Sequence, residues 1–253
     1  MSADLESAAV LITGAASGIG AATAKRLSDC GRSLVLLDRD GTRLVSLQAD
    51  LNGPSAVYEL DVSDPDAWHN VLENGAIPPL AGAVLCAGVS GAGLVSQMSF
   101  QDWRNVLSIN LDGAFLGLRA ALSVMLDGGA IAVVSSATAR KTAAMTSAYG
   151  ASKAGLEQLV RVTALEVAPR NIRVNAVAPG GVKTPMFTDQ AFFADLIEQT
   201  GSEAAAWAQL ASQTPLGQFA EPEDVAGCLT WLLSDETRLM TGTIVDLDGG
   251  YGL

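Results

Sequence analysis

The sequence predicts a single α/β domain of the doubly wound type, in which a seven-stranded parallel sheet is flanked by helices on both faces. Short runs rich in Val, Ile and Leu alternate with longer segments of helical periodicity, which is typical of parallel strands joined by crossover helices. The 253 residues suffice for one large core, and no repeat, linker or block of charge marks a second domain. We therefore expect one domain over residues 1–253.

The expected elements alternate along the chain. Strands are predicted at Ala9 to Thr13, Ser33 to Asp38, Ala56 to Leu60, Gly82 to Cys86, Ala130 to Ser135, Ile172 to Val177 and Ile244 to Leu247. Helices between them are predicted to begin near Gly18, Gly41, Pro65, Phe100, Ala148 and Glu221.

The stretch 185–219 breaks this alternation, because it is helical in composition and no strand follows it directly. It is either a longer crossover or a flap over the substrate. We favour the flap, since ligand sites in open α/β sheets lie beyond the carboxyl ends of the strands, where such insertions occur.

Composition argues against several classes of protein. The formal net charge is −12, which disfavours a nucleic-acid partner. The first nine residues carry two acids and no cationic region, and no stretch approaches the roughly 20 apolar residues of a membrane span, so we expect a cytoplasmic location. Cys30, Cys86 and Cys228 are too few and too widely spaced for a disulfide framework or zinc site. The single histidine, His69, lies in a polar stretch, and we expect no metal.

A glycine-rich turn follows the first predicted strand. The sequence Thr13-Gly-Ala-Ala-Ser-Gly-Ile-Gly20 runs directly into a helical pattern, so backbone N–H groups and a helix N-terminus would meet a pyrophosphate there. Alone, such a turn is equally compatible with a simple tight turn. Asp38, eighteen residues after Gly20 at the end of the second strand, is placed to accept from an adenosine ribose, which predicts a Rossmann-type dinucleotide site.

Asp38 also bears on the choice of dinucleotide. Its carboxylate would repel a ribose 2′-phosphate, and the glycine turn has no Arg or Lys, so NAD is favoured over NADP. Arg39 argues against the preference for NAD, because its guanidinium could turn toward the 2′-phosphate of NADP. Asp61, after the third strand, has two open interpretations: an acceptor for the adenine amino group, or a helix-start Asp.

Tyr149 and Lys153 lie four residues apart at the start of a predicted helix and therefore share one face. A nearby ammonium would lower the pKa of the phenol and make Tyr149 a proton carrier. Taken alone, the pair is a weak signal and is better explained as a solvated helix face. Ser136, thirteen residues upstream at the end of a buried strand, brings a hydroxyl to the same edge of the sheet and favours a chemical site.

From about Val10 to Gly250 the chain resembles the classical short-chain dehydrogenase/reductase family. The resemblance rests on the glycine turn, the Ser136, Tyr149 and Lys153 spacing, and the segments Asn110-Leu-Asp-Gly, Asn175-Ala-Val-Ala-Pro-Gly and Asp248-Gly-Gly. It implies that Ser136 binds the substrate oxygen, that Tyr149 and Lys153 exchange the proton, and that Asn110 holds a water linked to the lysine. It also implies a homotetramer.

The resemblance and the motifs together give a set of expected contacts. Those with the dinucleotide are Gly14, Ser17, Gly18, Ile19, Gly20, Asp38, Arg39, Asp61, Val62, Ala87, Gly88, Tyr149, Lys153, Pro179, Gly180, Val182 (through its backbone) and Thr184. Those with the substrate are Ser136, Thr138, Met145, Tyr149, Gly181, Met186 and Phe187. One departure is Leu85-Cys86-Ala87-Gly88, where the family usually has Asn-Asn-Ala-Gly; we expect it to affect local packing and stability more than activity.

The predicted function is NAD(H)-dependent interconversion of a secondary alcohol and a ketone, without a metal. Several apolar side chains either form the wall of a pocket for a hydrophobic or ring-bearing substrate or serve as core packing or subunit contacts: Met145, Met186, Phe187, Phe192, Phe193 and Trp207. One alternative is NADPH-dependent reduction of a 3-oxoacyl thioester on a carrier protein, which Ser17, Asp38 and the net charge disfavour. Another is a non-catalytic NAD-binding regulator, which the intact Ser, Tyr, Lys and Asn set disfavours.

Overall fold

A single parallel sheet organises the protein. The computed structural model describes residues 5, 7–75 and 77–253, so residues 1–4, 6 and 76 of the predicted domain lie outside the described residues. The sheet has seven strands in the order β3-β2-β1-β4-β5-β6-β7, with every neighbouring pair parallel. Their bounds are β1 Ala9–Thr13, β2 Leu34–Asp38, β3 Ser55–Glu59, β4 Leu80–Leu85, β5 Met125–Val134, β6 Arg173–Pro179 and β7 Ile244–Leu247. The predicted doubly wound sheet is confirmed, and its order reverses between β1 and β4.

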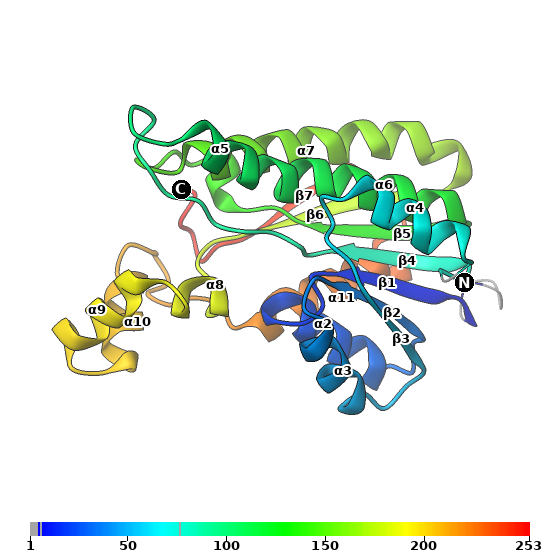
Figure 1. Cartoon of the computed structure of the whole chain (residues 1–253), viewed down its shortest axis with the longest axis horizontal. Helices are drawn as coiled ribbons and strands as arrows, with labels where there is room; N and C mark the ends of the chain where they lie inside the picture. Colours follow the sequence, from blue (N-terminus) through cyan, green and yellow to red (C-terminus); the bar gives the residue numbers. More distant parts are fainter. Residues whose placement is uncertain (1–4, 6, 76) are drawn as a thin grey trace.

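Helices cover both faces of the sheet (Figure 1). One face carries α4 (Pro65–Glu73), α5 (Phe100–Leu107), α6 (Gly113–Val124) and α7 (Ser147–Val167), and the other carries α2 (Gly18–Asp29), α3 (Gly41–Ala49) and α11 (Pro222–Leu233). All six predicted helix starts lie within one residue of an observed one.

The core lies in two layers because each buried strand presents alternate residues to opposite faces. In β1, Leu11 enters the cluster beneath α4, α6 and α7, whereas Val10 and Ile12 enter the cluster beneath α2 and α11. Both faces of the central strands are thus apolar, which explains why these strands read as continuous hydrophobic runs.

Local signals fix where several helices begin. The Asp64 carboxylate accepts from the backbone N–H groups of Asp66 and Ala67, and Pro65 occupies the first turn of α4. At α11, Glu221 and Asp224 form a reciprocal capping box, again with a proline in the first turn.

Two details of the fold differ from the sequence prediction. Strand β5 begins at Met125, five residues before the predicted Ala130, and its added segment includes Gly128 in a left-handed conformation. Between α5 and α6 the chain forms a π-helical turn, Ser108–Asp112, inside what the sequence predicts as one helix. The first difference arises because Asp127, Gly128 and Gly129 carry little strand propensity, whereas in the structure Met125 pairs with Leu80 before the register shifts and Ala130 pairs with Gly82.

Among the described residues, one helical stretch, Phe100–Val124, is long and apolar enough by composition to cross a membrane. It comprises α5, the π turn and α6, and the inner face of α6 contributes Leu116, Leu118 and Ala120 to the core. A helix of a protein core meets the same criterion, so length and composition alone are weak evidence of a membrane span.

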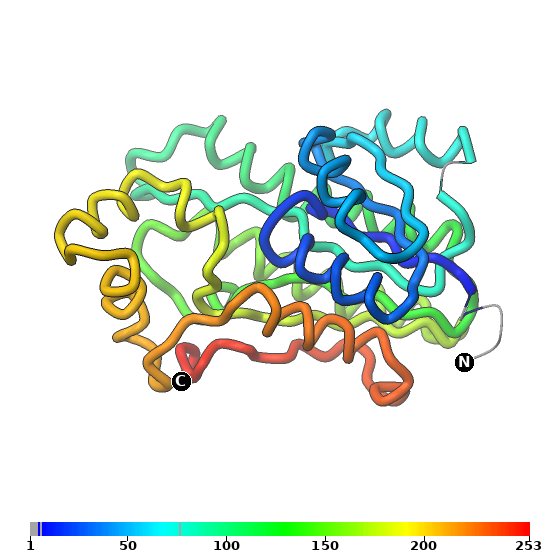
Figure 2. Tube along the Cα trace, turned by 90° about the horizontal axis from the view of Figure 1, so that it is seen from below, coloured from blue at the N-terminus to red at the C-terminus, as the bar shows by residue number. Residues whose placement is uncertain are grey.

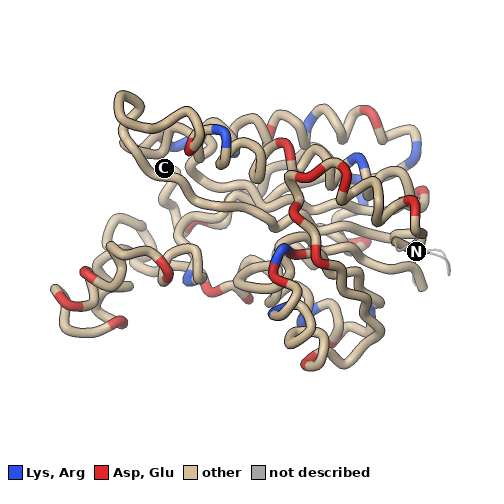
Figure 3. The backbone as a smooth tube through the Cα atoms, in the orientation of Figure 1, with Lys and Arg blue, Asp and Glu red and all other residues tan. Residues whose placement is uncertain are grey.

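The stretch 185–219 forms three helices beyond the carboxyl ends of the strands: α8 (Pro185–Thr188), α9 (Ala191–Thr200) and α10 (Glu203–Ala211) (Figures 1 and 2). Phe193, Ala206 and Trp207 make a small core of their own, separate from the two clusters at the sheet. Between Ala191 and Ala211 this segment has acidic side chains and no Lys or Arg (Figure 3).

Candidate active site

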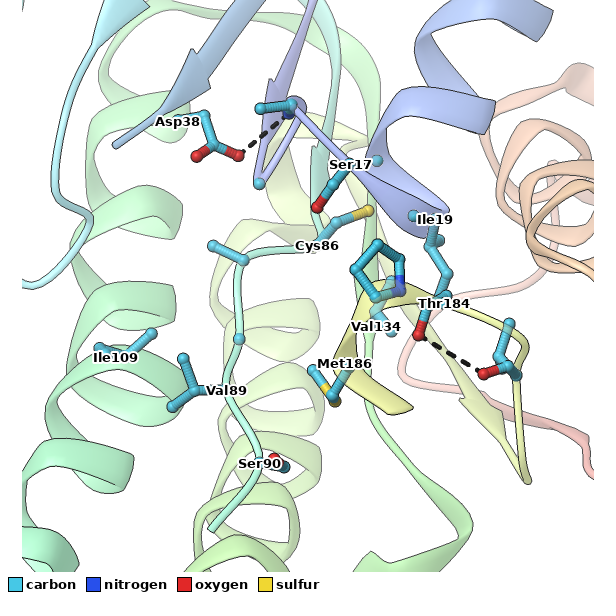
Figure 4. A pocket seen from close by; sticks show the side chains of 18 of the residues that line it. Ser17, Ile19, Asp38, Cys86, Val89, Ser90, Ile109, Val134, Thr184 and Met186 are labelled. Atoms are coloured by element: carbon cyan, nitrogen blue, oxygen red, sulfur yellow. Dashed lines mark hydrogen bonds between the residues drawn. The ribbon is translucent and has the colours of Figure 1, made fainter. Parts of the chain in front are cut away.

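A cleft of about 480 Å³ opens at the carboxyl ends of the strands, beside the neighbouring strands β1 and β4 between which the strand order reverses. This volume lies within the roughly 300–1,000 Å³ usual for small-molecule sites. In Figure 4, Val89 and Ile109 line one side of the cleft, and Ile19 and Thr184 line the other. Every residue that the sequence predicts as a dinucleotide contact lines it: Gly14, Ser17, Gly18, Ile19, Gly20, Asp38, Arg39, Asp61, Val62, Ala87, Gly88, Tyr149, Lys153, Pro179, Gly180, Val182 and Thr184.

The glycine turn has the shape that a dinucleotide requires. Gly14 has a φ of 65°, and a Cβ there would lie 2.7 Å from the backbone nitrogen of Ala87. A Cβ on Gly20 would lie 2.0 Å from the carbonyl oxygen of Gly14. These glycines are required by close backbone packing, and the turn leads into the N-terminus of α2, where backbone N–H groups favour an anion. The residues present therefore fit a pyrophosphate.

Asp38 lies in the cleft beside the glycine turn and is held there by the backbone. One carboxylate oxygen accepts from the N–H of Ala16 at 3.0 Å, as Figure 4 shows, and the other accepts from the N–H of Asp40 at 3.0 Å. A carboxylate has about four acceptor positions, so two contacts leave room for ribose hydroxyls.

Asp61 does not cap the helix that follows it. That position belongs to Asp64, whereas the Asp61 carboxylate accepts from the N–H of Ser63 at 2.9 Å and from its hydroxyl at 2.7 Å. These bonds, the hydroxyl first, hold the pKa of Asp61 below its ordinary value, with a further contribution from Arg39. Of the two interpretations, helix capping is wrong, and Asp61 stays ionised at the edge of the cleft.

Ser136, Tyr149 and Lys153 meet in the cleft. A hydrogen bond joins the phenol of Tyr149 to Ser136, whose Oγ also lies 3.0 Å from Oγ1 of Thr138. The ammonium of Lys153 is buried, donates to the carbonyl of Val134 at 2.8 Å, and lies 5.8 Å from the centre of the Tyr149 ring. One hydroxyl acceptor, one phenol and one ammonium thus converge on one small volume.

The pKa of Tyr149 differs from the sequence expectation. Burial raises the pKa of the phenol, and the Ser136 hydrogen bond offsets only part of that increase. Burial also lowers the pKa of Lys153 to about 8. The expected acidification of Tyr149 by Lys153 is therefore wrong for the protein alone, because the ammonium points at the Val134 carbonyl and desolvation dominates.

Asn110 lies behind the cleft, in the π turn between α5 and α6. Its side chain is buried, its Oδ1 accepts from the N–H of Val89 at 2.8 Å, and its Nδ2 donates to the carbonyl of Val89 and to Ser152 Oγ. The side chain thereby anchors the loop after β4 and is not in the lining of the cleft. Short π-helical turns occur frequently at functional sites.

The predicted substrate contacts separate into two groups. Ser136, Tyr149, Met186 and Phe187 line the cleft, whereas Thr138, Met145 and Gly181 do not. Met145 is half exposed and has a φ of 69°, and the ring of Phe219 covers Gly181. Phe193 and Trp207 are buried in the small core of the 185–219 segment, so for them ordinary packing is the correct interpretation.

The cleft also contains residues that the sequence prediction missed. Cys86, Val89, Ser90 and Ile109 lie on the β4 side, and burial raises the pKa of the Cys86 thiol to about 12. The motif at residues 85–88 was the available signal, because a strand end beside a glycine places the following chain at the cleft. Among the described residues, no group of three or more His, Cys, Asp or Glu side chains is arranged to hold a metal ion.

Comparisons with known proteins extend over nearly the whole chain. A family model described as enoyl-(acyl carrier protein) reductase matches residues 14–252. The chain is 36% identical to the 3-oxoacyl-[acyl-carrier-protein] reductase of Thermotoga maritima, covering 97% of this chain and 98% of that protein. It is 34% identical to 3beta-hydroxysteroid dehydrogenase 1 of Eggerthella lenta, with coverage of 99% and 95%. A short-chain dehydrogenase/reductase of Serratia marcescens superposes with a TM-score of 0.88 at 26% identity, covering 98% and 99%.

Proposed function

The chain belongs to the short-chain dehydrogenase/reductase family of oxidoreductases, and on that premise we propose that it interconverts a secondary alcohol and a ketone with NAD(H). The observation that carries the proposal is that Ser136, Tyr149 and Lys153 meet in one cleft, which the glycine turn and Asp38 also line. A proton-exchanging pair and a dinucleotide-shaped turn in one cleft suit a reaction that moves a proton and a hydride together.

In the direction of oxidation, the chain's own groups handle the oxygen and the proton. Ser136 Oγ holds the alcohol oxygen, and Tyr149 removes the hydroxyl proton in its phenolate form, which the raised pKa makes the minor form in the protein alone, while the C–H bond breaks. A bound nicotinamide dinucleotide supplies the hydride acceptor. Lys153 keeps positive charge beside the phenol and binds the nicotinamide ribose, and Asn110 keeps the loop after β4 in place for a water connected to Lys153. Reduction is the reverse, with Tyr149 donating the proton.

We assign NAD rather than NADP as the preferred dinucleotide. The two backbone N–H groups that hold Asp38 fix a negative charge at the adenosine end, where a 2′-phosphate would be repelled. Arg39 and Arg43 also line the cleft, but Arg43 forms an ion pair with Asp40 at 3.4 Å, and Arg39 stabilises ionised Asp61. Both guanidinium groups thus already interact with carboxylates, so neither is an argument for a 2′-phosphate.

The substrate we propose is hydrophobic or ring-bearing. Met186 and Phe187, at the start of the 185–219 segment, line the cleft and offer it apolar surface. The Phe187 ring packs edge-on against Trp207 at 5.9 Å between centroids, so the apolar wall is backed by the segment's own core. On this arrangement, the 185–219 segment is a flap that covers the substrate. The steroid dehydrogenase relative acts, by its name, on a ring-bearing alcohol.

A second candidate is reduction of a 3-oxoacyl thioester, because the Thermotoga maritima relative has that activity by name. Against it stand Asp38 and the acidic flap, since an acidic carrier protein requires a basic docking surface.

The test is a coupled screen with the purified protein. Cyclic, steroidal, aromatic and sugar-like secondary alcohols are offered with NAD and with NADP, and acetoacetyl-coenzyme A is offered with NADH and NADPH. We expect NAD-linked oxidation of an apolar cyclic alcohol, abolished in Tyr149→Phe. Preference for the thioester with NADPH would establish the second candidate, and no turnover in any arm would refute the enzyme assignment to this substrate class.

We further propose a cytoplasmic homotetramer. Phe115 on α6 and Val162 and Leu165 on α7 are exposed apolar side chains on one helical layer, which suits a subunit interface. Light scattering of the purified protein tests the assembly, and cell fractionation tests the location.

A further inference from the structure

The loop from Ala137 to Thr146 joins the two halves of the chemical site. Ser136 immediately precedes it, and α7, which carries Tyr149 and Lys153, follows it. Its residues from Arg140 to Met145 are mostly exposed, and Met145 adopts a positive φ that an unbranched side chain seldom takes. A loop of this kind needs contacts from outside to keep one conformation.

Arg140 makes the strongest of these contacts. Its two terminal guanidinium nitrogens donate to both carboxylate oxygens of Asp246 on β7, one of them at 3.0 Å. Its Nε lies 3.4 Å from Oε1 of Glu157 on α7. A bidentate contact between a guanidinium and a carboxylate fixes the relative orientation of the two groups as well as their distance, which a single ion pair does not.

Glu157 connects Arg140 to the site. Its carboxylate is only 3% exposed and accepts from the hydroxyl of Ser135, the residue next to Ser136, at 3.2 Å. Glu157 also lies one helical turn after Lys153 on α7. One buried carboxylate therefore contacts the end of β5, the loop and the helix that carries the phenol.

The next residue of the loop is tied to the same end of the chain. The ammonium of Lys141 donates to the backbone carbonyl of Tyr251 and lies 4.2 Å from the centre of its ring. The turn that holds Tyr251 also contacts the end of the 185–219 segment, because Gly249 accepts from the N–H of Leu216 at 3.1 Å. Both adjacent cations thus anchor the loop to β7 and the C-terminal turn.

We propose that Arg140 is a positioning residue, which holds Ser136 against Tyr149 by clamping the loop between Asp246 and Glu157. The proposal rests on the proposed function for its kinetic consequence, but the geometry it describes is measurable without a substrate. An ordinary exposed ion pair contributes little to stability. The Arg140 contacts differ from such a pair, because the Glu157 carboxylate is buried and both carboxylate oxygens of Asp246 accept from the guanidinium.

The matched control is Arg161. It contacts the same carboxylate, Glu157 Oε2, at 3.2 Å and is exposed to the same degree as Arg140, but it lies on α7 and is not part of the loop. Removing either arginine takes one cation from Glu157. Only the loss of Arg140 also removes a contact that holds the loop.

The experiment compares Arg140→Ala, Arg140→Lys, Asp246→Asn and Arg161→Ala. For Arg140→Ala we expect kcat/KM to fall about 10- to 100-fold through misplacement of Ser136, with the Kd of NADH unchanged. Asp246→Asn, which leaves the loop sequence intact, is expected to lose activity in the same direction by a smaller factor. Arg140→Lys, which keeps the charge without the two-pronged contact, is expected between wild type and Arg140→Ala. Arg161→Ala is expected to match wild type.

The substrate-independent readout is the carbon-13 signal of the Tyr149 ring, identified among three tyrosines by its loss in Tyr149→Phe. The hydrogen bond from Ser136 lowers the pKa of this phenol. Arg140→Ala and Asp246→Asn should displace Ser136 and so raise the pKa of Tyr149, whereas Arg161→Ala should leave that pKa unchanged. An unchanged Tyr149 titration in both loop-releasing variants overturns the proposal, even if no substrate is found. An equal effect of Arg161→Ala also overturns it, because the cause is then the charge on Glu157. If Arg140→Ala does not fold, Asp246→Asn and Arg140→Lys decide the matter.

Discussion

The two sides of the cleft are held in different ways. On the dinucleotide side, the glycine turn packs backbone against backbone, and Asp38 is held by two main-chain N–H groups. On the side proposed for the substrate, Phe187 is supported by ring contacts within a segment that has its own small core. One side is fixed by the main chain and the other by side-chain packing.

This difference decides how each side tolerates change. Where backbone atoms approach closely, any Cβ is excluded and the residue type is set by geometry. Where apolar side chains fill a volume, several combinations of similar volume serve. We therefore expect single substitutions on the dinucleotide side to cause large losses of nucleotide affinity. Substitutions on the substrate side should change substrate preference gradually.

The largest effect is expected where the two sides meet, at Tyr149. Tyr149→Phe removes the proton-carrying hydroxyl and keeps the ring, so kcat should fall by about 10²- to 10⁴-fold while the Kd of NADH is unchanged. Steady-state kinetics and fluorescence titration with NADH measure the two quantities. Retention of most of the activity would exclude Tyr149 as the proton carrier.

A second prediction separates close packing from backbone strain at a glycine. Gly14 and Gly31 both have positive φ, at 65° and 76°, but a Cβ on Gly14 collides with Ala87 whereas one on Gly31 meets nothing within 4 Å. Each change to Ala should cost about 1–2 kcal/mol of stability from the left-handed conformation. Only Gly14→Ala should also weaken NADH binding, by tenfold or more at about 1.4 kcal/mol per tenfold. Equal binding losses in both variants would show that strain alone is responsible.

The same difference explains what could be predicted from the sequence. The glycine turn, Asp38 and the Tyr149–Lys153 pair were identifiable because geometry demands particular residue types at particular spacings. For residues 185–219 the sequence favoured a flap but did not say which side chains face a pocket, since Phe193 and Trp207 suit a pocket wall and a core equally well by sequence. The π turn at Asn110 and the early start of β5 were missed, because both are set by tertiary contacts rather than by local propensity. The contact between Arg140 and Asp246 joins residues over a hundred positions apart, so no local sequence pattern predicts it.

A smaller effect is expected on the choice of dinucleotide. Asp38→Asn removes the negative charge while keeping an acceptor oxygen for a backbone N–H, so the ratio of kcat/KM for NADP to that for NAD should rise by roughly tenfold, or about 1.4 kcal/mol. Asp40→Asn is the control, since Asp40 also lines the cleft but its carboxylate accepts from Arg43. A similar ratio change in both variants would point to overall charge instead of the ribose contact.

On the substrate side, Phe187→Leu should raise KM for an apolar substrate by several-fold, in line with the roughly 1–3 kcal/mol that hydrophobic pocket contacts contribute. The Kd of NADH should not change. Phe192→Leu, in a half-exposed ring on the same flap, is the control. If Phe187→Leu instead weakens NADH binding alone, Phe187 belongs to the dinucleotide side.

The smallest expected effect concerns Lys153, whose burial between the two sides lowers its pKa to about 8 from an ordinary value of 10.5. Below pH 8 the lysine is protonated in both the folded and the unfolded chain, and its contribution to stability does not vary. Above pH 8 the unfolded chain binds more protons, so the free energy of unfolding rises with pH, by at most about 1.4 kcal/mol per unit. Cys86 opposes this rise above pH 9, because its pKa is raised to about 12 in the folded protein and the unfolded thiol ionises first.

The window between pH 8 and 9 therefore isolates the lysine. Denaturant unfolding of wild type and Lys153→Met across this window gives a difference in which contributions common to both proteins cancel. We expect wild type to gain stability relative to Lys153→Met as the pH rises. Parallel curves would mean that Lys153 keeps its ordinary pKa. In that case a group on one side of the cleft stabilises the charged ammonium and offsets the effect of burial.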